Sequence, residues 1–202
     1  MAGRLILASK SPRRYELLKQ MGFHFDVIQS SVEEKNFVGY ESPRDHVIRL
    51  SEEKAREVGR TYPDSWVLGA DTVVCIDGTL LGKPKTREEA LEMLRQLSGK
   101  EHSVLTGFSV LNISKGKGER GAVETAVKVK FLSPQEMEWY VQTGEPFDKA
   151  GAYAIQGIGS FMIESIRGSC TNVIGLPVCE VMEMLVRLGA ITISECGIQI
   201  VE

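Results

Sequence analysis

The sequence predicts a mixed α/β protein with a long-stranded, twisted sheet and flanking helices. Short apolar runs that are followed by capped amphipathic segments are typical of strand–helix units. The pair Asp77-Gly78 lies between two apolar runs, which is a strong signal for a β-hairpin. Two long β-patterned runs, residues 102–113 and 122–132, indicate long neighbouring strands, and the second run alternates clearly. Because strand–helix units and hairpins occur together, we expect helices around a mixed sheet, either as one body or as two lobes around a cleft.

The N-terminal part is predicted to alternate between strands and helices. Residues 5–8 form an apolar run that stops at polar residues, as a buried strand does. Residues 11–21 are predicted as a helix, because serine stands at the cap and proline at the first helical position. Residues 25–28 alternate as a strand does, and a second Ser-Pro pair begins a helix over residues 42–58.

The central region is predicted to hold a strand, a hairpin and a helix. Residues 66–70 are apolar and are expected to form a buried strand that ends at Asp71. Residues 73–76 and 79–81 flank the Asp-Gly pair and are the expected hairpin strands. Residues 86–97 carry acidic side chains early and a basic one late, which suits the dipole of a helix.

The C-terminal half begins with the two long strands, joined by a glycine- and lysine-rich tip at residues 114–121. Helices are predicted over residues 133–141 and 177–188, and a strand over residues 160–166. The tail from residue 190 alternates weakly, and we expect either an edge strand or a loose segment there.

Composition limits the classes of function. The chain has 202 residues, and we expect one catalytic domain at residues 1–189 with a tail at residues 190–202. A net charge of −3 argues against a nucleic-acid binder, which usually carries a broad basic surface. The sequence has neither a signal peptide pattern nor an apolar run of membrane-spanning length, so we expect a cytoplasmic protein without a membrane partner. The four cysteines form no Cys-x-x-Cys pair and predict neither a zinc site nor a disulfide framework.

Residues 9–14 (SKSPRR) are the first segment with a chemical pattern. A strand, a tight turn and a helix start together make an anion site from free backbone N–H groups. Arg13 and Arg14 stand in the first helical turn, where the dipole disfavours cations by roughly 0.3–1 kcal/mol each. A bound phosphate would remove this penalty, and the guanidinium group suits phosphate. The alternative is a plain helix cap with two solvated arginines.

Asp71 and Lys83 form the second candidate group. Asp71 is expected at the carboxyl end of a strand, where open α/β sheets bind ligands, and the small Gly69 and Ala70 leave room beside it. Lys83 follows the hairpin, which folds the chain back beside the strand after Asp71, so Lys83 could approach Asp71 or a bound phosphate. The alternatives are a turn aspartate and an exposed loop lysine.

Two further segments supply polar groups. Glu33 and Glu34 are paired carboxylates that could hold a hard divalent cation, and Lys54 on the second helix is grouped with them. A solvated charge run is the usual meaning of such a pattern and is favoured by the pattern alone. Gln156 lies in the glycine- and alanine-rich residues 148–157 and offers an amide that can recognise a base edge. A tightly packed structural turn explains the same pattern equally well.

The order of these segments is more distinctive than any of them alone. They are residues 8–14 (ASKSPRR), 32–34 (VEE), 54–55 (KA), 69–74 (GADTVV), 82–84 (GKP), 97–99 (LSG), 148–153 (DKAGAY), 156–157 (QG) and 175–177 (GLP). In this order they closely resemble the Maf family of nucleotide pyrophosphatases, over about residues 5–188. Ala154 stands where glycine is common in the family, and the tail after Gly189 departs from the family pattern.

The resemblance implies a fold like that of inosine triphosphate pyrophosphatases, a divalent metal (Mg²⁺ or Mn²⁺) and release of pyrophosphate. It also implies that Asp71 is the proton acceptor. The branch that acts on dTTP and UTP is similar to this chain at Arg13, Thr72 and Gln156. The branch that acts on 7-methyl-GTP typically has glutamine after the catalytic aspartate, and this chain has threonine there.

We therefore expect a nucleoside triphosphate pyrophosphatase that hydrolyses dTTP and UTP. The expected catalytic residues are Asp71, Glu34 and Lys83, the substrate-binding residues are Ser9, Arg13, Arg14, Lys54, Thr72 and Gln156, and the metal ligands are Glu34 and Asp71. Either Asp71 or Glu34 could be the base, with the other as metal ligand. The alternatives are a pyrophosphatase for a modified purine triphosphate such as 7-methyl-GTP and a nucleotide-binding regulator of septum formation. The family also makes a homodimer plausible.

Overall fold

The computed structural model describes residues 4–33, 41–195 and 197–201. The chain divides into two compact units. The first unit comprises Met1–Asp71, Thr106–Val123 and Gly175–Glu202, and the second comprises Thr72–Leu105 and Glu124–Ile174. Three long strands contribute residues to both units.

The predicted mixed sheet is confirmed. Among the described residues the strand order is β2-β1-β3-β5-β6-β7, with β4 paired to β3. The strands are β1 (Leu5–Leu7), β2 (Asp26–Val27), β3 (Trp66–Ile76), β4 (Thr79–Leu81), β5 (Glu101–Asn112), β6 (Lys117–Val129) and β7 (Ile163–Arg167). Strand β1 pairs in parallel with β2 and β3, whereas β3–β4 and β6–β7 are antiparallel pairs. The sheet is therefore both long-stranded and mixed.

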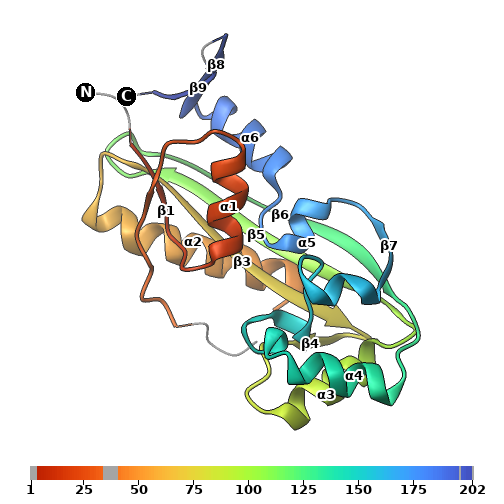
Figure 1. The fold of residues 1–202 in the computed structure, drawn as a ribbon. Coiled ribbons are helices and arrows are strands. Elements are labelled where there is room, and N and C mark those ends of the chain that lie inside the picture. Colours follow the sequence, from red (N-terminus) through yellow and green to blue (C-terminus); the bar gives the residue numbers. More distant parts are fainter. Residues whose placement is uncertain (1–3, 34–40, 196, 202) are drawn as a thin grey trace. The chain divides into compact units, whose positions relative to one another are not determined.

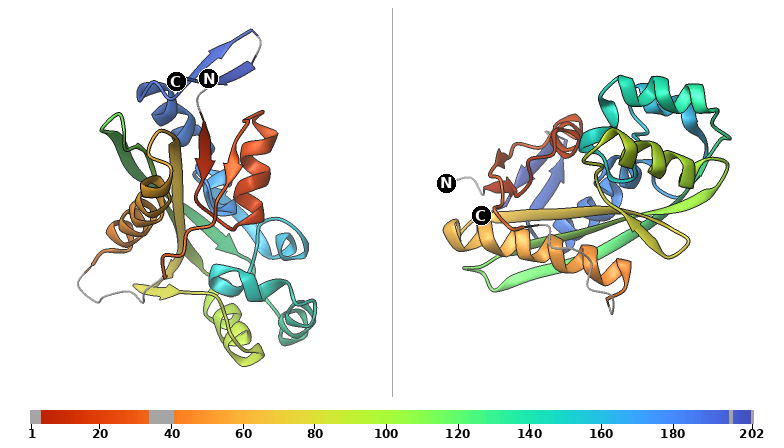
Figure 2. Two further views of the ribbon diagram at one scale, coloured as in Figure 1. Left: turned by 90° about the vertical axis from the view of Figure 1, so that its left-hand side faces the viewer. Right: turned by 90° about the horizontal axis from the view of Figure 1, so that it is seen from below.

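The first unit covers its part of the sheet on both faces. Its helices are α1 (Pro12–Gln20), α2 (Pro43–Thr61) and α6 (Val178–Arg187). Helices α1 and α2 lie on opposite sides of β1 and β3 (Figure 1 and Figure 2). The alternation of β1 explains this arrangement, because Ile6 packs in one buried cluster with Ala55 and Val58 of α2. Both of the Ser-Pro helix starts predicted in this unit are confirmed.

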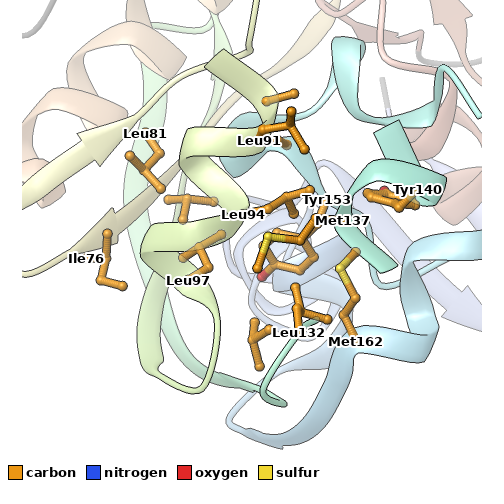
Figure 3. Close-up of a cluster of buried hydrophobic side chains, with 14 of the residues drawn as sticks. Ile76, Leu81, Leu91, Leu94, Leu97, Leu132, Met137, Tyr140, Tyr153 and Met162 are labelled. Atoms are coloured by element: carbon orange, nitrogen blue, oxygen red, sulfur yellow. The ribbon is translucent and has the colours of Figure 1, made fainter. Parts of the chain in front are cut away.

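The second unit has its own hydrophobic core (Figure 3). Its helices are α3 (Arg87–Leu97), α4 (Pro134–Gln142) and α5 (Cys170–Ile174), with 3₁₀ turns η1 (Glu145–Asp148), η2 (Ala150–Ala152) and η3 (Ile158–Met162). Leu94 and Leu97 of α3 face Met137 and Tyr140 of α4 in one cluster, and Tyr153 joins it from the segment after η2 (Figure 3). This core anchors the chain on both sides of the glycine-rich segment.

The hairpin predicted at Asp77-Gly78 is confirmed. Strands β3 and β4 pair in the register Val74↔Leu81. Asp77 and Gly78 have φ values of 49° and 77°. Positive φ at both central residues matches the right-handed twist of the flanking strands, and glycine adopts it without steric cost.

Several elements differ from the prediction. Strand β3 continues through Asp71 to Ile76 instead of ending at residue 71. Strand β6 begins at Lys117, five residues before the predicted start, because the glycines at 118 and 121 interrupt the alternation that the prediction used. Residues 160–162 belong to η3, so β7 is shorter than predicted. The short helix α5 had no sequence signal.

The C-terminal tail forms a sheet of its own. Strands β8 (Ile191–Ser194) and β9 (Gly197–Ile200) pair antiparallel with each other (Figure 1). The edge strand expected as one alternative is thus replaced by a separate hairpin. Among the helices that the structure describes, none combines the length and apolarity needed to cross a bilayer.

Candidate active site

Asp71 owes its surroundings to the close approach of α2 to β3. Gly69 and Asp71 are two residues apart in β3 and therefore share one face of the strand. A Cβ atom on Gly69 would overlap the Ser51 carbonyl oxygen and lie 2.8 Å from the Ala55 nitrogen. Only glycine at position 69 lets this turn of α2 lie so near the strand. The same turn carries Lys54.

Lys54 and Asp71 form a buried ion pair. The Lys54 Nζ donates to Asp71 Oδ1 at 2.6 Å, and the two side chains are 9% and 8% exposed. Removing one member of such a pair leaves an uncompensated buried charge, which typically costs about 3–5 kcal/mol. An aspartate in the middle of a strand is unusual, and the lysine explains why it is tolerated here. The pair holds a carboxylate, which is a proton acceptor and a hard ligand, at a fixed place on β3.

Arg14 connects three segments of the first unit. Its Nη1 donates to Ser9 Oγ at 3.1 Å and to the Ala70 carbonyl at 3.0 Å. Its Nε donates to the Gly175 carbonyl at 2.7 Å, and the residue is only 9% exposed. Arg14 therefore ties the turn before α1 to the residue that precedes Asp71. These contacts give Arg14 a positioning role, in addition to the phosphate contact expected from the sequence.

The start of α1 keeps the features of an anion site. Within the described part of the chain, Ser11 makes no side-chain cap and the first turn holds no acidic residue. Ser9 Oγ accepts from the Ser11 N–H at 3.2 Å, which orders the turn. Arg13 is partly exposed at this helix end. The positive end of the helix and the basic side chains together favour a bound anion.

Thr72, Lys83 and Gln156 belong to the second unit. Lys83 is exposed two residues after β4, and the β3–β4 register continued that far brings it opposite Thr72. Gln156 is exposed between η2 and η3. The Gly151 N–H donates to the Gly82 carbonyl at 3.0 Å. Within this unit, the loop of Lys83 and the segment that leads to Gln156 are therefore tied together.

The predicted metal ligands are only partly described. Glu34 lies outside the described residues, and its neighbour Glu33 is exposed. The residues with described positions contain no group of three His, Cys, Asp or Glu side chains that could hold a metal ion. Of the two predicted metal ligands, Asp71 lies among the described residues.

Two contacts of the second unit escaped the sequence prediction. His102 Nε2 lies 2.7 Å from the Tyr153 hydroxyl, and burial lowers the pKa of His102 to about 4. Glu145 accepts hydrogen bonds from the Ile158 and Gly159 N–H groups. The partners are separated by 51 residues in the first contact and by 13 and 14 residues in the second, and no motif signals either pairing.

Comparisons with known proteins identify the family and several relatives of the chain. A family model described as "Maf-like protein" matches residues 4–188. A dTTP/UTP pyrophosphatase of Syntrophus aciditrophicus (strain SB) is 51% identical over 191 residues, which cover 95% of this chain and 93% of the relative. A dTTP/UTP pyrophosphatase of Syntrophotalea carbinolica is 50% identical, with 93% of this chain and 86% of the relative covered. One from Geotalea uraniireducens is 48% identical, with 93% and 96% covered. The similarity spans nearly the whole of each protein.

Proposed function

The chain belongs to the Maf-like protein family, and on this premise we propose that it hydrolyses dTTP and UTP to the nucleoside monophosphate and pyrophosphate. The observation that carries the proposal is the buried Lys54–Asp71 pair. Arg14 contacts both Ser9 and the carbonyl of Ala70, the residue that precedes Asp71. A protein that only binds a nucleotide has no need of a carboxylate fixed in this way. Relatives that are about half identical over most of their length bear the name dTTP/UTP pyrophosphatase, which supports the substrate.

The triphosphate is bound by cationic groups and free N–H groups. The start of α1 supplies backbone donors and the positive end of the helix dipole. Ser9 and Arg13 contact phosphate oxygens, and Arg14 keeps Ser9 in place. Lys54 and Lys83 neutralise further phosphate charge. These roles rest on the contacts of the described side chains and on the family.

Asp71 activates the attacking water. Its carboxylate takes a proton from the water as the water oxygen forms a bond to the α-phosphorus. The bond between the α-phosphorus and the bridging oxygen to the β-phosphorus breaks, and pyrophosphate leaves with that oxygen. Lys54 keeps the carboxylate oriented through the 2.6 Å contact to Oδ1. General-base help of this kind is worth roughly 10²–10⁴-fold in rate.

A divalent cation fits the residues that are present. Magnesium usually binds through one or two carboxylates together with substrate phosphates, so a complete protein cage is not required. The Asp71 carboxylate matches that pattern, and Glu34 is the second ligand implied by the family. When bound, Mg²⁺ or Mn²⁺ would neutralise the charge that develops on the phosphoryl oxygens.

The pyrimidine base is recognised by Gln156 and Thr72. An amide donates and accepts hydrogen bonds, which suits the alternating donor and acceptor groups on the edge of thymine or uracil. Gln156 is exposed and therefore accessible to a ligand. Threonine at position 72, in place of the glutamine typical of the 7-methyl-GTP branch, also favours the pyrimidine substrate.

A pyrophosphate-release assay tests the proposal. We expect the protein, with Mg²⁺ or Mn²⁺, to release pyrophosphate from dTTP and UTP faster than from dCTP, dGTP or 7-methyl-GTP. Asp71→Asn should lower kcat at least about 10²-fold while nucleotide binding is retained, because the side chain keeps its shape and loses its basicity. Nucleotide binding without pyrophosphate release by the wild type would favour a regulator, and orthophosphate as the product would contradict attack at the α-phosphorus.

A further inference from the structure

The carboxylate of Glu145 closes the turn that follows Gln156. Its Oε2 accepts from the Ile158 N–H at 2.9 Å, and its Oε1 accepts from the Gly159 N–H at 2.9 Å. Two successive backbone donors are thus directed at one side chain. Burial opposes the charged form, yet hydrogen bonds from Gly159 and Ile158 hold the pKa of Glu145 below its usual value. Glu145 is therefore an ionised clamp on the backbone two and three residues beyond Gln156.

Tyr140 extends the clamp to the other side of Gln156. Its hydroxyl donates to Glu145 Oε1 at 3.0 Å. The same hydroxyl interacts with the Ala154 backbone N–H, two residues before Gln156. Tyr140 is fully buried on α4 in the core of the second unit (Figure 3). Backbone groups on both sides of Gln156 are thus fixed to one tyrosine–glutamate pair.

Gly157 leaves room for the Glu145 carboxylate because it has no side chain. Its φ of 80° lies in the region that favours glycine. A Cβ atom at this position would lie 2.7 Å from Glu145 Oε2. The residue directly after Gln156 is therefore restricted both by its backbone conformation and by the space that the carboxylate occupies. The turn has little freedom to reorient the glutamine.

The geometry points to Glu145, supported by Tyr140, as a positioning residue that sets base selectivity by fixing the segment that carries Gln156. This inference rests on the proposed function, in which Gln156 contacts the pyrimidine base. Glu145 itself touches the backbone of the turn, so its effect on the substrate passes through Gln156. A recognition group that is already oriented in the free protein binds its ligand more tightly, because the entropy of ordering that group is lost during folding and not on binding.

The test compares Glu145→Gln with the wild type and with Glu164→Gln, a matched neutralisation at an exposed position on β7 of the same unit. A glutamine presents one oxygen to the two N–H groups, so at least one clamp bond is lost. We expect the selectivity for dTTP over dCTP, as a ratio of kcat/KM, to fall on the order of tenfold, which is the range of one hydrogen bond. The change should lie mainly in KM for dTTP. Glu164→Gln should leave the ratio unchanged.

A double-mutant cycle separates positioning from a general structural effect. If Glu145 acts through Gln156, the double variant Glu145→Gln/Gln156→Ala should be no less selective than Gln156→Ala alone. The Ile158 and Gly159 amides should also exchange hydrogen faster in Glu145→Gln than in Glu164→Gln. Additive losses in the cycle would overturn the inference.

The outcomes distinguish this inference from the function on which it rests. A selective wild type with an equally selective, folded Glu145→Gln variant refutes the clamp and leaves the proposed function intact. If the wild type does not prefer dTTP over dCTP, the proposed base preference is wrong, and the inference about Glu145 is wrong as well. If Glu145→Gln fails to fold, Tyr140→Phe decides, because it removes the hydroxyl contacts to Glu145 and to the Ala154 N–H and keeps the carboxylate. Unchanged selectivity in that variant also overturns the inference.

Discussion

Neighbouring arginines in the first turn of α1 have different environments. Arg14 is buried and donates to two backbone carbonyls and to Ser9, whereas Arg13 is partly exposed. Identical side chains next to each other in the sequence are therefore expected to contribute to different properties. Arg14 should contribute mainly to folding, and Arg13 mainly to the phosphate contact.

Replacing each arginine by lysine tests this division. Arg14→Lys keeps the charge but loses the planar guanidinium group with its several N–H donors, so buried oxygen atoms that accept from Arg14 lose their hydrogen bonds. We expect the free energy of unfolding to fall by about 1–3 kcal/mol, the cost of leaving a buried polar group unsatisfied. Arg13→Lys should change it by less than about 0.5 kcal/mol, as surface substitutions usually do, and should raise KM for dTTP. Urea unfolding and steady-state kinetics measure both effects; equal losses of stability would contradict the division.

Residue patterns single out candidate side chains for the site but do not show what those side chains contact. Lys54 and Asp71 were both expected at the site, but their ion pair depends on how closely α2 approaches β3 and is not visible in the sequence. The acceptor of Arg14 at Gly175 lies 161 residues away. A motif identifies chemistry-bearing residues, whereas contacts made through backbone carbonyls carry no residue-type signal. The ligand role of Glu34 and the substrate contacts of Lys83 and Thr72 stay predictions.

The contact between α2 and β3 is the structural requirement for the Lys54–Asp71 pair. Gly69→Ala introduces a methyl group where α2 leaves no room, so the helix must shift. We expect a loss of about 1–3 kcal/mol of unfolding free energy, the usual cost of overpacking. We also expect a lower kcat, because Lys54 moves with α2. Gly82→Ala is the matched control for stability, because nothing lies within 4 Å of its added Cβ. Thermal unfolding of the two variants should differ clearly; equal melting temperatures would show that α2 is not in contact at Gly69.

Element types were easier to predict than element ends. Local backbone preferences determine the Ser-Pro starts of α1, α2 and α4 and the hairpin turn, and the predictions of these features are confirmed. The prediction ends strand β3 too early because aspartate is disfavoured in strands. The lysine that compensates for this aspartate comes from another element. Helix α5 is five residues long and too short for a periodic signal.

At the level of the whole molecule, alternating strand and helix signals were enough to predict a mixed sheet. The division into two units was not predictable in detail, because β3, β5 and β6 each supply residues to both. Local patterns identify a strand but do not show where its surroundings change along its length. The assignment of residues 1–189 to one catalytic domain, and the homodimer, stay predictions.

The pH dependence of global stability should depend on His102. The residue is 4% exposed, and burial lowers the pKa of its side chain from 6.5 to about 4. Below pH 6.5 the unfolded chain binds a proton at this side chain that the folded protein excludes. The stabilising contribution of neutral His102 is therefore complete above pH 6.5 and is lost as the pH falls towards 4. The total loss is about 3 kcal/mol, at up to about 1.4 kcal/mol per pH unit.

Urea unfolding at several pH values between 7 and 4.5 measures this effect. Glutamates with lowered pKa values, such as Glu145 and Glu136, contribute to the stability of the fold, and this contribution is lost below about pH 4.5. The change in stability between pH 7 and 4.5 therefore reports mainly on the histidine. The free energy of unfolding of His102→Gln should depend less on pH than that of the wild type. The slope of this free energy against pH reports proton binding, whereas its value at pH 7 reports packing, so the comparison holds whatever the stability of the variant at pH 7. His24→Gln, at an exposed position, should keep the slope of the wild type. Equal slopes for His102→Gln and the wild type would mean that His102 is not kept neutral by burial, and that water reaches the ring beside Tyr153.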